Sequence, residues 1–228
     1  MIRNFYRIRL TGSGRAHWYA FIMLLAAGIF SAACSRPRTG AEAAKRAREA
    51  MKQVKSWKVR SADRLQNQPY TVETIKEYVC PSRMRETSSY LNDPGARPYP
   101  DAGVNLIIDG TLYIAAAKNP KWERVGGKAW NPLKECAAMA SGRDIDTMPP
   151  LGNWITRSSI EGAQRDTRSG RCQEWQLMPS LIPGEDEIIC FGVDDYLPRI
   201  YTRGTATIEF FDWNVPIDLE APKLEEKP

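Results

Sequence analysis

Histidine is almost missing from this chain: the only one among 228 residues is His17. It lies within residues 1–33, which we expect to be removed for the reasons given below. The rest of the chain therefore cannot build a Ser-His-Asp site, a Cys-His site or the usual zinc site. Carboxylate-pair and Ser-Lys chemistry stay open, but histidine is the commonest general base. We expect a protein that is not an enzyme.

The N-terminal segment has no acidic residue, and its apolar run is too short to span a membrane. The residues before Trp18 carry Arg3, Arg7, Arg9 and Arg15 and no acid, and Ala20 to Phe30 is apolar apart from one glycine. This run of roughly a dozen residues is shorter than the ~20 that a membrane-spanning helix needs. A basic head, a short apolar centre and the small residues 31–33 predict a secretory signal that is cleaved after residue 33.

Cys34 follows this segment directly, and SAAC resembles the lipobox of bacterial lipoproteins, with Ser31 where that family favours leucine. The resemblance implies that Cys34 is lipidated and tethers the protein to a membrane through residues 34–40. Several acyl chains make such an anchor stable, since one chain binds only marginally. Two alternatives stay open: an uncleaved N-terminal anchor, or a soluble export signal cut before an ordinary cysteine.

An excess of positive charge is also missing once the signal is set aside. Residues 1–33 carry four arginines and no acid, so their removal lowers the formal charge from +5 to +1. The remaining charges are mixed along the chain, and we expect no nucleic-acid partner. The 195 residues that remain suffice for one domain, which we place at 41–222, with a frayed tail at 223–228.

Four cysteines remain besides Cys34, and an even number in an exported chain predicts two disulfides. Three pairings are conceivable. Cys172 and Cys190 lie in a segment that reads as strand, turn and strand, where directly opposed positions come within disulfide reach. Cys80 would then pair with Cys136.

The periodicity of the chain predicts one clear helix followed by many short strands. Residues 41–55 repeat alanines and other apolar residues at helical spacing, and Pro132 to Ala140 could form a second, short helix. Alternating or β-branched stretches predict about ten strands joined by short turns, hence an antiparallel sheet. The eleven stretches behind this approximate count are 56–60, 70–79, 83–89, 104–108, 112–116, 121–125, 155–160, 171–178, 187–193, 199–203 and 206–213.

The order of several short motifs resembles the LolA/LolB-like superfamily of envelope lipoproteins and lipoprotein carriers, including its LppX-type branch. The motifs are VKSWKV, VCPSRMR, IDGTLYI, KWERV, CQEWQL, DDYLPRI and ATIEFFDWNVPI, which span most of residues 41–222. The resemblance implies an α+β fold, mainly antiparallel β: an incomplete, half-open β-barrel covered by an N-terminal helix and a second short helix. The space between sheet and helices holds acyl chains in the carrier members.

A curved sheet with an apolar inner face must be covered, and an apolar cavity left beneath the cover suits a lipid tail. We therefore expect a membrane-anchored, non-catalytic envelope lipoprotein that binds a lipid or an acylated ligand. Candidates for lining its cavity are Trp57, Val59, Ile107, Tyr113, Trp122, Trp175 and Phe210. The alternative is an interaction lipoprotein with a filled core that presents a surface to another envelope protein.

Two weaker signals concern a metal and the compartment. Asp144 and Asp146 could bind calcium but lack a further ligand pattern, so we expect no metal and no cofactor. Ser35 is not the aspartate that marks inner-membrane retention in the best-known sorting rule. We therefore expect a protein anchored in the outer membrane and facing the periplasm.

Overall fold

The computed structural model describes residues 36–64, 71–91, 103–116, 119–126, 133–141, 151–179 and 183–224. The signal at 1–33, the lipidation site Cys34 and the calcium candidates Asp144 and Asp146 lie outside these ranges, as do residues 225–228 of the tail. The chain divides into a unit up to Pro37 and a unit from Arg38 onward. Everything below concerns the second unit.

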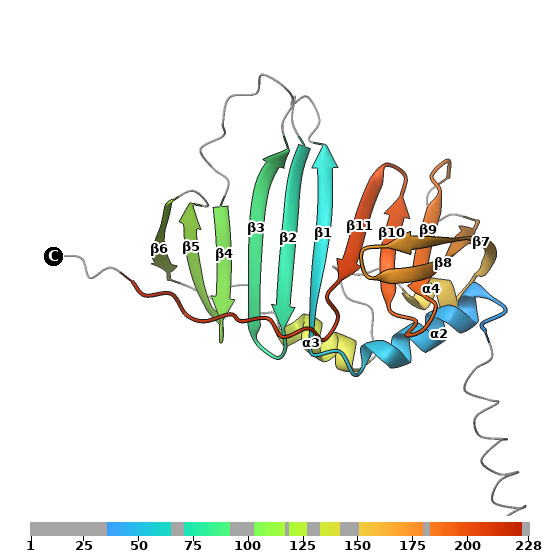
Figure 1. Cartoon of the computed structure of the whole chain (residues 1–228), viewed down its shortest axis with the longest axis horizontal. Helices are drawn as coiled ribbons and strands as arrows, with labels where there is room; N and C mark the ends of the chain where they lie inside the picture. Colours follow the sequence, from blue (N-terminus) through green and yellow to red (C-terminus); the bar gives the residue numbers. More distant parts are fainter. Residues whose placement is uncertain are drawn as a thin grey trace, which may run out of the picture. The chain divides into compact units, whose positions relative to one another are not determined.

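Eleven antiparallel strands form a single open sheet (Figure 1). Its order is β6-β5-β4-β3-β2-β1-β11-β10-β9-β8-β7, so the first and last strands of the chain are neighbours at its centre. The sheet is not closed, because β6 and β7 are its two edges. The strands are β1 Ser56–Arg64, β2 Thr71–Val79, β3 Arg83–Leu91, β4 Gly103–Ile108, β5 Thr111–Ala116, β6 Asn119–Val125, β7 Ser158–Thr167, β8 Gly170–Met178, β9 Glu187–Gly192, β10 Pro198–Arg203 and β11 Ala206–Phe211.

Tight turns hold the register of the sheet. Asp109 and Gly110 both have positive φ, 49° and 82°, and join β4 to β5 in the two-residue turn that this dipeptide predicts. A second tight turn joins β7 to β8 and ends at Gly170, whose φ is 105°. Between β1 and β11 there is no such turn, and Lys58 lies opposite Phe211 only because the chain returns across the whole domain.

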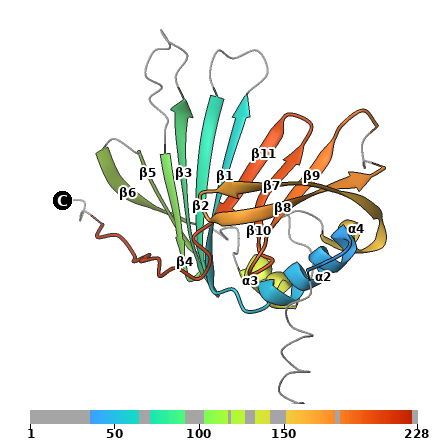
Figure 2. The same ribbon diagram turned by 45° about the vertical axis from the view of Figure 1, so that its right-hand side comes forward.

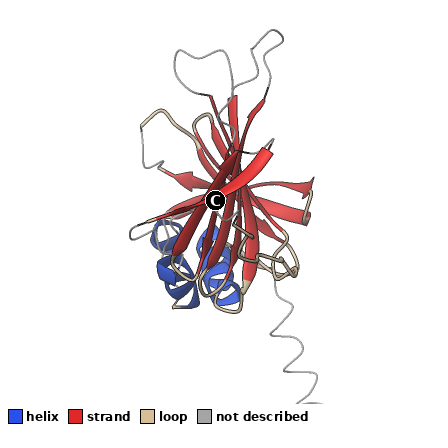
Figure 3. Ribbon diagram, turned by 90° about the vertical axis from the view of Figure 1, so that its left-hand side faces the viewer, coloured by secondary structure: helices blue, strands red, loops and turns tan. Residues whose placement is uncertain are grey.

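Three helices, α2 Gly40–Met51, α3 Leu133–Ala140 and α4 Leu151–Thr156, lie together at one end of the sheet (Figures 1 and 3). Thr39 caps α2 by accepting a hydrogen bond from the Glu42 amide at 3.2 Å, and the Glu42 carboxylate accepts one from the Arg38 amide at 2.8 Å. The helix was expected to extend to residue 55 but ends at Met51.

The third helix corrects the sequence-based expectation of a strand at 155–160, because α4 occupies the start of that range and β7 begins only at Ser158. Leu151 and Trp154, three residues apart, are 2% and 0% exposed, so one turn of helix buries both against the core. The Thr156 hydroxyl donates to the carbonyl of Gly152 at 3.1 Å. Two prolines precede Leu151 in the sequence, which favours a helix start there over a strand.

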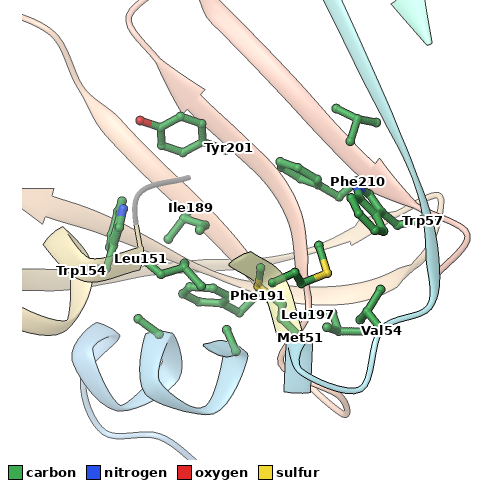
Figure 4. Packing of buried hydrophobic residues seen from close by; sticks show 14 of the residues in the cluster. Met51, Val54, Trp57, Leu151, Trp154, Ile189, Phe191, Leu197, Tyr201 and Phe210 are labelled. Carbon is green, nitrogen blue, oxygen red and sulfur yellow. The ribbon is translucent and has the colours of Figure 1, made fainter. Parts of the chain in front are cut away.

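The main core lies between the helices and one face of the sheet, which we call the inner face (Figure 4). Alanines 43, 44 and 47 of α2 are almost completely buried, and their small side chains let the helix lie close to the strands. Large side chains fill the space between these alanines and the strands. The fully buried ones include Trp57, Trp154, Trp175, Tyr78, Phe191, Phe210, Met139, Leu177 and Ile189.

The outer face is the side of the sheet opposite the inner face. A second, smaller hydrophobic cluster lies on it, over strands β2, β4, β5 and β6. There Leu106 and Ile108 pack with Leu219 of the C-terminal segment. This segment, residues 215–224, runs across β1 to β5 (Figure 1) and we call it the C-terminal strap. Arg83 holds it by donating from Nη1 to the carbonyl of Leu219 at 2.9 Å.

Two disulfides are present, Cys80–Cys136 and Cys172–Cys190. The first ties α3 to the end of β2. The second differs from the sequence-based expectation in its register: Cys172 lies opposite Gly192, and Cys190 lies opposite Glu174. The bridge therefore joins diagonal positions of β8 and β9, at a Cα–Cα distance of 5.5 Å.

Candidate functional site

The inner face changes from apolar to polar along β2, β3 and β4. Near the helices, Tyr78, Met84 and Ile107 lie side by side on β2, β3 and β4. Two residues further along these strands, in the direction away from the helices, the matching row is Lys76, Glu86 and Asn105. An apolar surface thus borders a polar one on the same face.

A hollow of about 330 Å³ lies where the two surfaces meet, and we call it the inner hollow. Its apolar wall consists of Met84 and Ile107, which are 4% and 3% exposed, and of the half-buried Leu112. Leu112 reaches it because it lies directly opposite Ile107 across the β4–β5 hairpin. The volume is within the range of small-molecule pockets, roughly 300–1,000 Å³.

The polar row at the other side of the inner hollow is internally paired. Lys76 Nζ lies 3.1 Å from Glu86 Oε2, and Asn105 Nδ2 donates to Glu86 Oε1 at 3.2 Å. The side chains of Lys76 and Glu86 are 33% and 24% exposed, so the pair remains in contact with solvent. The row carries no net charge and can offer both donors and acceptors to a polar group beside the apolar wall.

The structure brings some of the seven cavity candidates together and separates others. Trp57, Val59, Trp175, Phe210 and Ile107 all lie in the main core, but only Ile107 lines the inner hollow. Trp57, Trp175 and Phe210 are at most 2% exposed and fill the core. Tyr113 and Trp122 lie on the outer face, packed against Leu106, Ile108 and the strap.

Sequence reasoning missed most residues of the inner hollow, namely Met84, Leu112, Lys76, Glu86 and Asn105. Met84 and Leu112 alternate with polar or aromatic neighbours on short hairpin strands, so their shared face was readable from the period of two. Tyr113 follows Leu112, and adjacent residues of a strand face opposite sides. Tyr113 therefore lies on the side of β5 that faces away from the inner hollow.

Neither a metal centre nor a membrane-crossing helix is found within the described part of the chain. No three histidine, cysteine, aspartate or glutamate side chains come close enough there to hold a metal ion. The helices that the structure describes are all too short or too polar to cross a bilayer.

The fold and the inner hollow together define an open antiparallel half-barrel with helices against its inner face. This is the fold of LprF from Mycobacterium bovis: at 10% identity, 82% of this chain and 99% of that chain superpose with a TM-score of 0.53. The LolA/LppX-like fold implied by the sequence motifs is thereby confirmed.

Two further structures are similar at lower scores. The Mycobacterium tuberculosis lipoprotein LppX shares 10% identity, over 79% of this chain and 98% of that one, with a TM-score of 0.48. A LolA superfamily protein from Nitrosomonas europaea shares 9%, over 84% and 96%, with a TM-score of 0.26. No protein-family model and no curated protein matches the sequence.

Proposed function

We propose that this protein is a non-catalytic envelope lipoprotein that binds the acyl chain of a lipid or acylated ligand in the inner hollow. Lipidated Cys34 anchors it, and the domain faces the periplasm from the outer membrane. The signal-like segment and the SAAC motif support the anchor, and the half-barrel fold supports a binding domain.

One observation carries the binding proposal: Met84, Ile107 and the half-buried Leu112 form an apolar wall of the inner hollow. Each methylene of a ligand that leaves water gains about 0.8 kcal/mol. The neutral row of Lys76, Glu86 and Asn105 then lies beside the polar end of the ligand. An apolar pocket with a few convergent polar groups is the usual form of a small-molecule site.

A fluorescent fatty acid tests the proposal on full-length protein that has been stripped of bound lipid. We expect saturable binding with one site per chain. Leu112→Asn places an amide in the apolar wall, and we expect it to weaken binding by about tenfold, which corresponds to about 1.4 kcal/mol.

Ile75→Asn is the matched control, because Ile75 is also half-buried but lies on the outer face, opposite Arg60. Its binding should equal that of the unchanged protein. Absence of uptake by the unchanged protein, or equal losses in both variants, would contradict the proposal.

A second candidate function is that of an interaction protein, and the packing of the main core favours it. Trp57, Trp154 and Trp175 fill the space between the helices and the sheet. A protein that takes up no fatty acid but co-purifies with one envelope protein would have this function instead. The anchor is tested separately by mass spectrometry, in which Cys34→Ala should abolish the mass of the acyl groups.

A further inference from the structure

A second hollow, of about 470 Å³, lies on the outer face, and we call it the outer hollow. The tip of the β7–β8 hairpin lies over β10 and β11 there, as Figures 1 and 2 show. Arg168 at this tip places its guanidinium carbon 4.4 Å from the ring centroid of Phe211 on β11. The hairpin tip and the two strands thus form opposite walls.

Arg199 is among the residues that line the outer hollow, and its side chain is largely buried. A bulge between Pro198 and Ile200 interrupts the register of β10 at this residue, which is 7% exposed. Its Nη2 donates to Asp195 at 2.5 Å, whereas its Nε and Nη1 are buried and have no hydrogen-bond partner among the residues that the structure describes. A buried charged donor without an acceptor is strongly unfavourable. The guanidinium therefore has two donors for an acceptor that the described protein atoms do not supply.

The other charges around the outer hollow are mostly paired. Arg165 lies 3.0 Å from Glu174. The two acids of the lining, Asp166 and Glu209, lie 3.3 Å from Arg171 and 3.4 Å from Arg60, respectively. Arg168 has no carboxylate partner within the described ranges, and its guanidinium lies over the Phe211 ring. Arg168 and the partly used Arg199 remain as the two cations able to bind an anion.

We propose that the outer hollow binds a phosphate ester, with the phosphate held between Arg168 and Arg199. A guanidinium presents its N–H groups as a planar fork that fits phosphate oxygens. A phosphate supplies enough acceptor oxygens for both forks, whereas a carboxylate has only two. The volume exceeds the needs of a bare ion and leaves room for the group that the phosphate carries. This site lies on the opposite face of the sheet from the inner hollow and is independent of it.

Calorimetric titration of the full-length protein tests this site with two phosphate sources. Glycerol 3-phosphate represents a soluble ester, and monomeric dihexanoyl phosphatidic acid represents a lipid headgroup. We expect at least one to bind. Arg168→Gln and Arg199→Lys should each weaken binding about tenfold or more, the first by removing a cation and the second by removing the fork.

Arg124→Gln is the matched control, because it removes one exposed arginine from the outer face of the edge strand β6. Binding of dihexanoyl phosphatidic acid alone identifies a lipid headgroup, and binding of both ligands identifies the phosphate group itself; either supports the proposal when Arg168→Gln weakens it, whereas phosphatidic acid binding that Arg168→Gln leaves unchanged belongs to the inner hollow and overturns it. No binding, equal binding of acetate, or the same loss in Arg124→Gln overturns it.

Arg168 is exposed, so Arg168→Gln keeps the test valid if Arg199→Lys fails to fold. Fatty-acid uptake by Arg168→Gln should equal that of the unchanged protein, because uptake belongs to the other face of the sheet.

Discussion

The indole ring of Trp57 stacks on the phenol ring of Tyr78, with ring centroids 4.4 Å apart and planes inclined by 9°. The two residues are directly opposed on β1 and β2, and neither side chain is exposed. Trp213, which follows β11, extends the stack at 6.5 Å from Trp57. This aromatic column joins the first, second and last strands at the centre of the sheet.

Truncation of Trp57 should therefore destabilise the whole domain. We expect Trp57→Ala to lower the free energy of unfolding by about 3–5 kcal/mol, as is typical for a buried aromatic residue. Urea denaturation followed by circular dichroism measures the change. Trp122→Ala is the control, because Trp122 is only partly buried, on the outer face, and should cost clearly less. Equal losses would contradict a central role for the aromatic column.

The two disulfides should contribute unequally to stability. Their cysteines are separated by 56 residues in Cys80–Cys136 and by 18 in Cys172–Cys190. The chain-entropy model gives about 4 and about 3 kcal/mol for loops of these lengths. We expect the double serine variant at Cys80 and Cys136 to unfold at lower urea than the variant at Cys172 and Cys190. The reverse order would show that loop length does not govern these bridges.

Glu77 should make the domain sensitive to acid. Burial opposes ionisation of Glu77, but its hydrogen bond and attraction to Arg85, with further help from Lys58, outweigh this and lower its pKa. A carboxyl whose pKa is lower in the folded state stabilises that state above its unfolded pKa, near 4.5. This stability is lost as pH falls below that value toward the folded pKa.

Glu77→Gln should lower the unfolding free energy by about 1–3 kcal/mol at neutral pH, because charged hydrogen bonds are lost. Between pH 5 and pH 3 (roughly the range in which such groups titrate), its stability should fall less than that of the unchanged protein. Glu123→Gln is the control, because Glu123 is exposed. Parallel pH profiles for Glu77→Gln and the unchanged protein would contradict this assignment.

The C-terminal strap should depend on Leu219. This residue is 2% exposed and is the deepest contact of the strap with the outer face. Leu219→Ala should cost about 2–5 kcal/mol, shared between local detachment of the strap and global unfolding. Limited proteolysis should then cleave the strap faster. The exposed neighbour Glu220 provides the control Glu220→Ala, for which cleavage should be unchanged.

Local patterns in the sequence predicted most of the sheet. The Asp109-Gly110 turn, the β-branched strands and the alanine face of α2 depend on neighbours within a few residues, so they can be read without a structure. The six-residue α4 was missed because so short a segment carries little periodicity. Its helical form depends on Leu151 and Trp154 reaching a core built from distant strands.

The same distinction applies to the candidate sites. Period-two alternation assigns residues of one strand to two faces, but it does not say which face the helices cover. Tyr113 and Trp122 are partly buried on the outer face because the strap returns over them, a contact between segments about 100 residues apart. The outer hollow likewise requires the tip of β7–β8 to meet β10 and β11.

The sequence by itself determined the strands, their turns, the α2 helix and the cysteines available for pairing, because these follow from local geometry and composition. Only the tertiary structure decided which face is covered, where the two hollows lie, and that Arg199 is buried with two donors that no described residue accepts from. The reason is physical. Burial and pairing are set by contacts between residues far apart in the chain, and one such contact can reverse the environment of a side chain without changing its local structure.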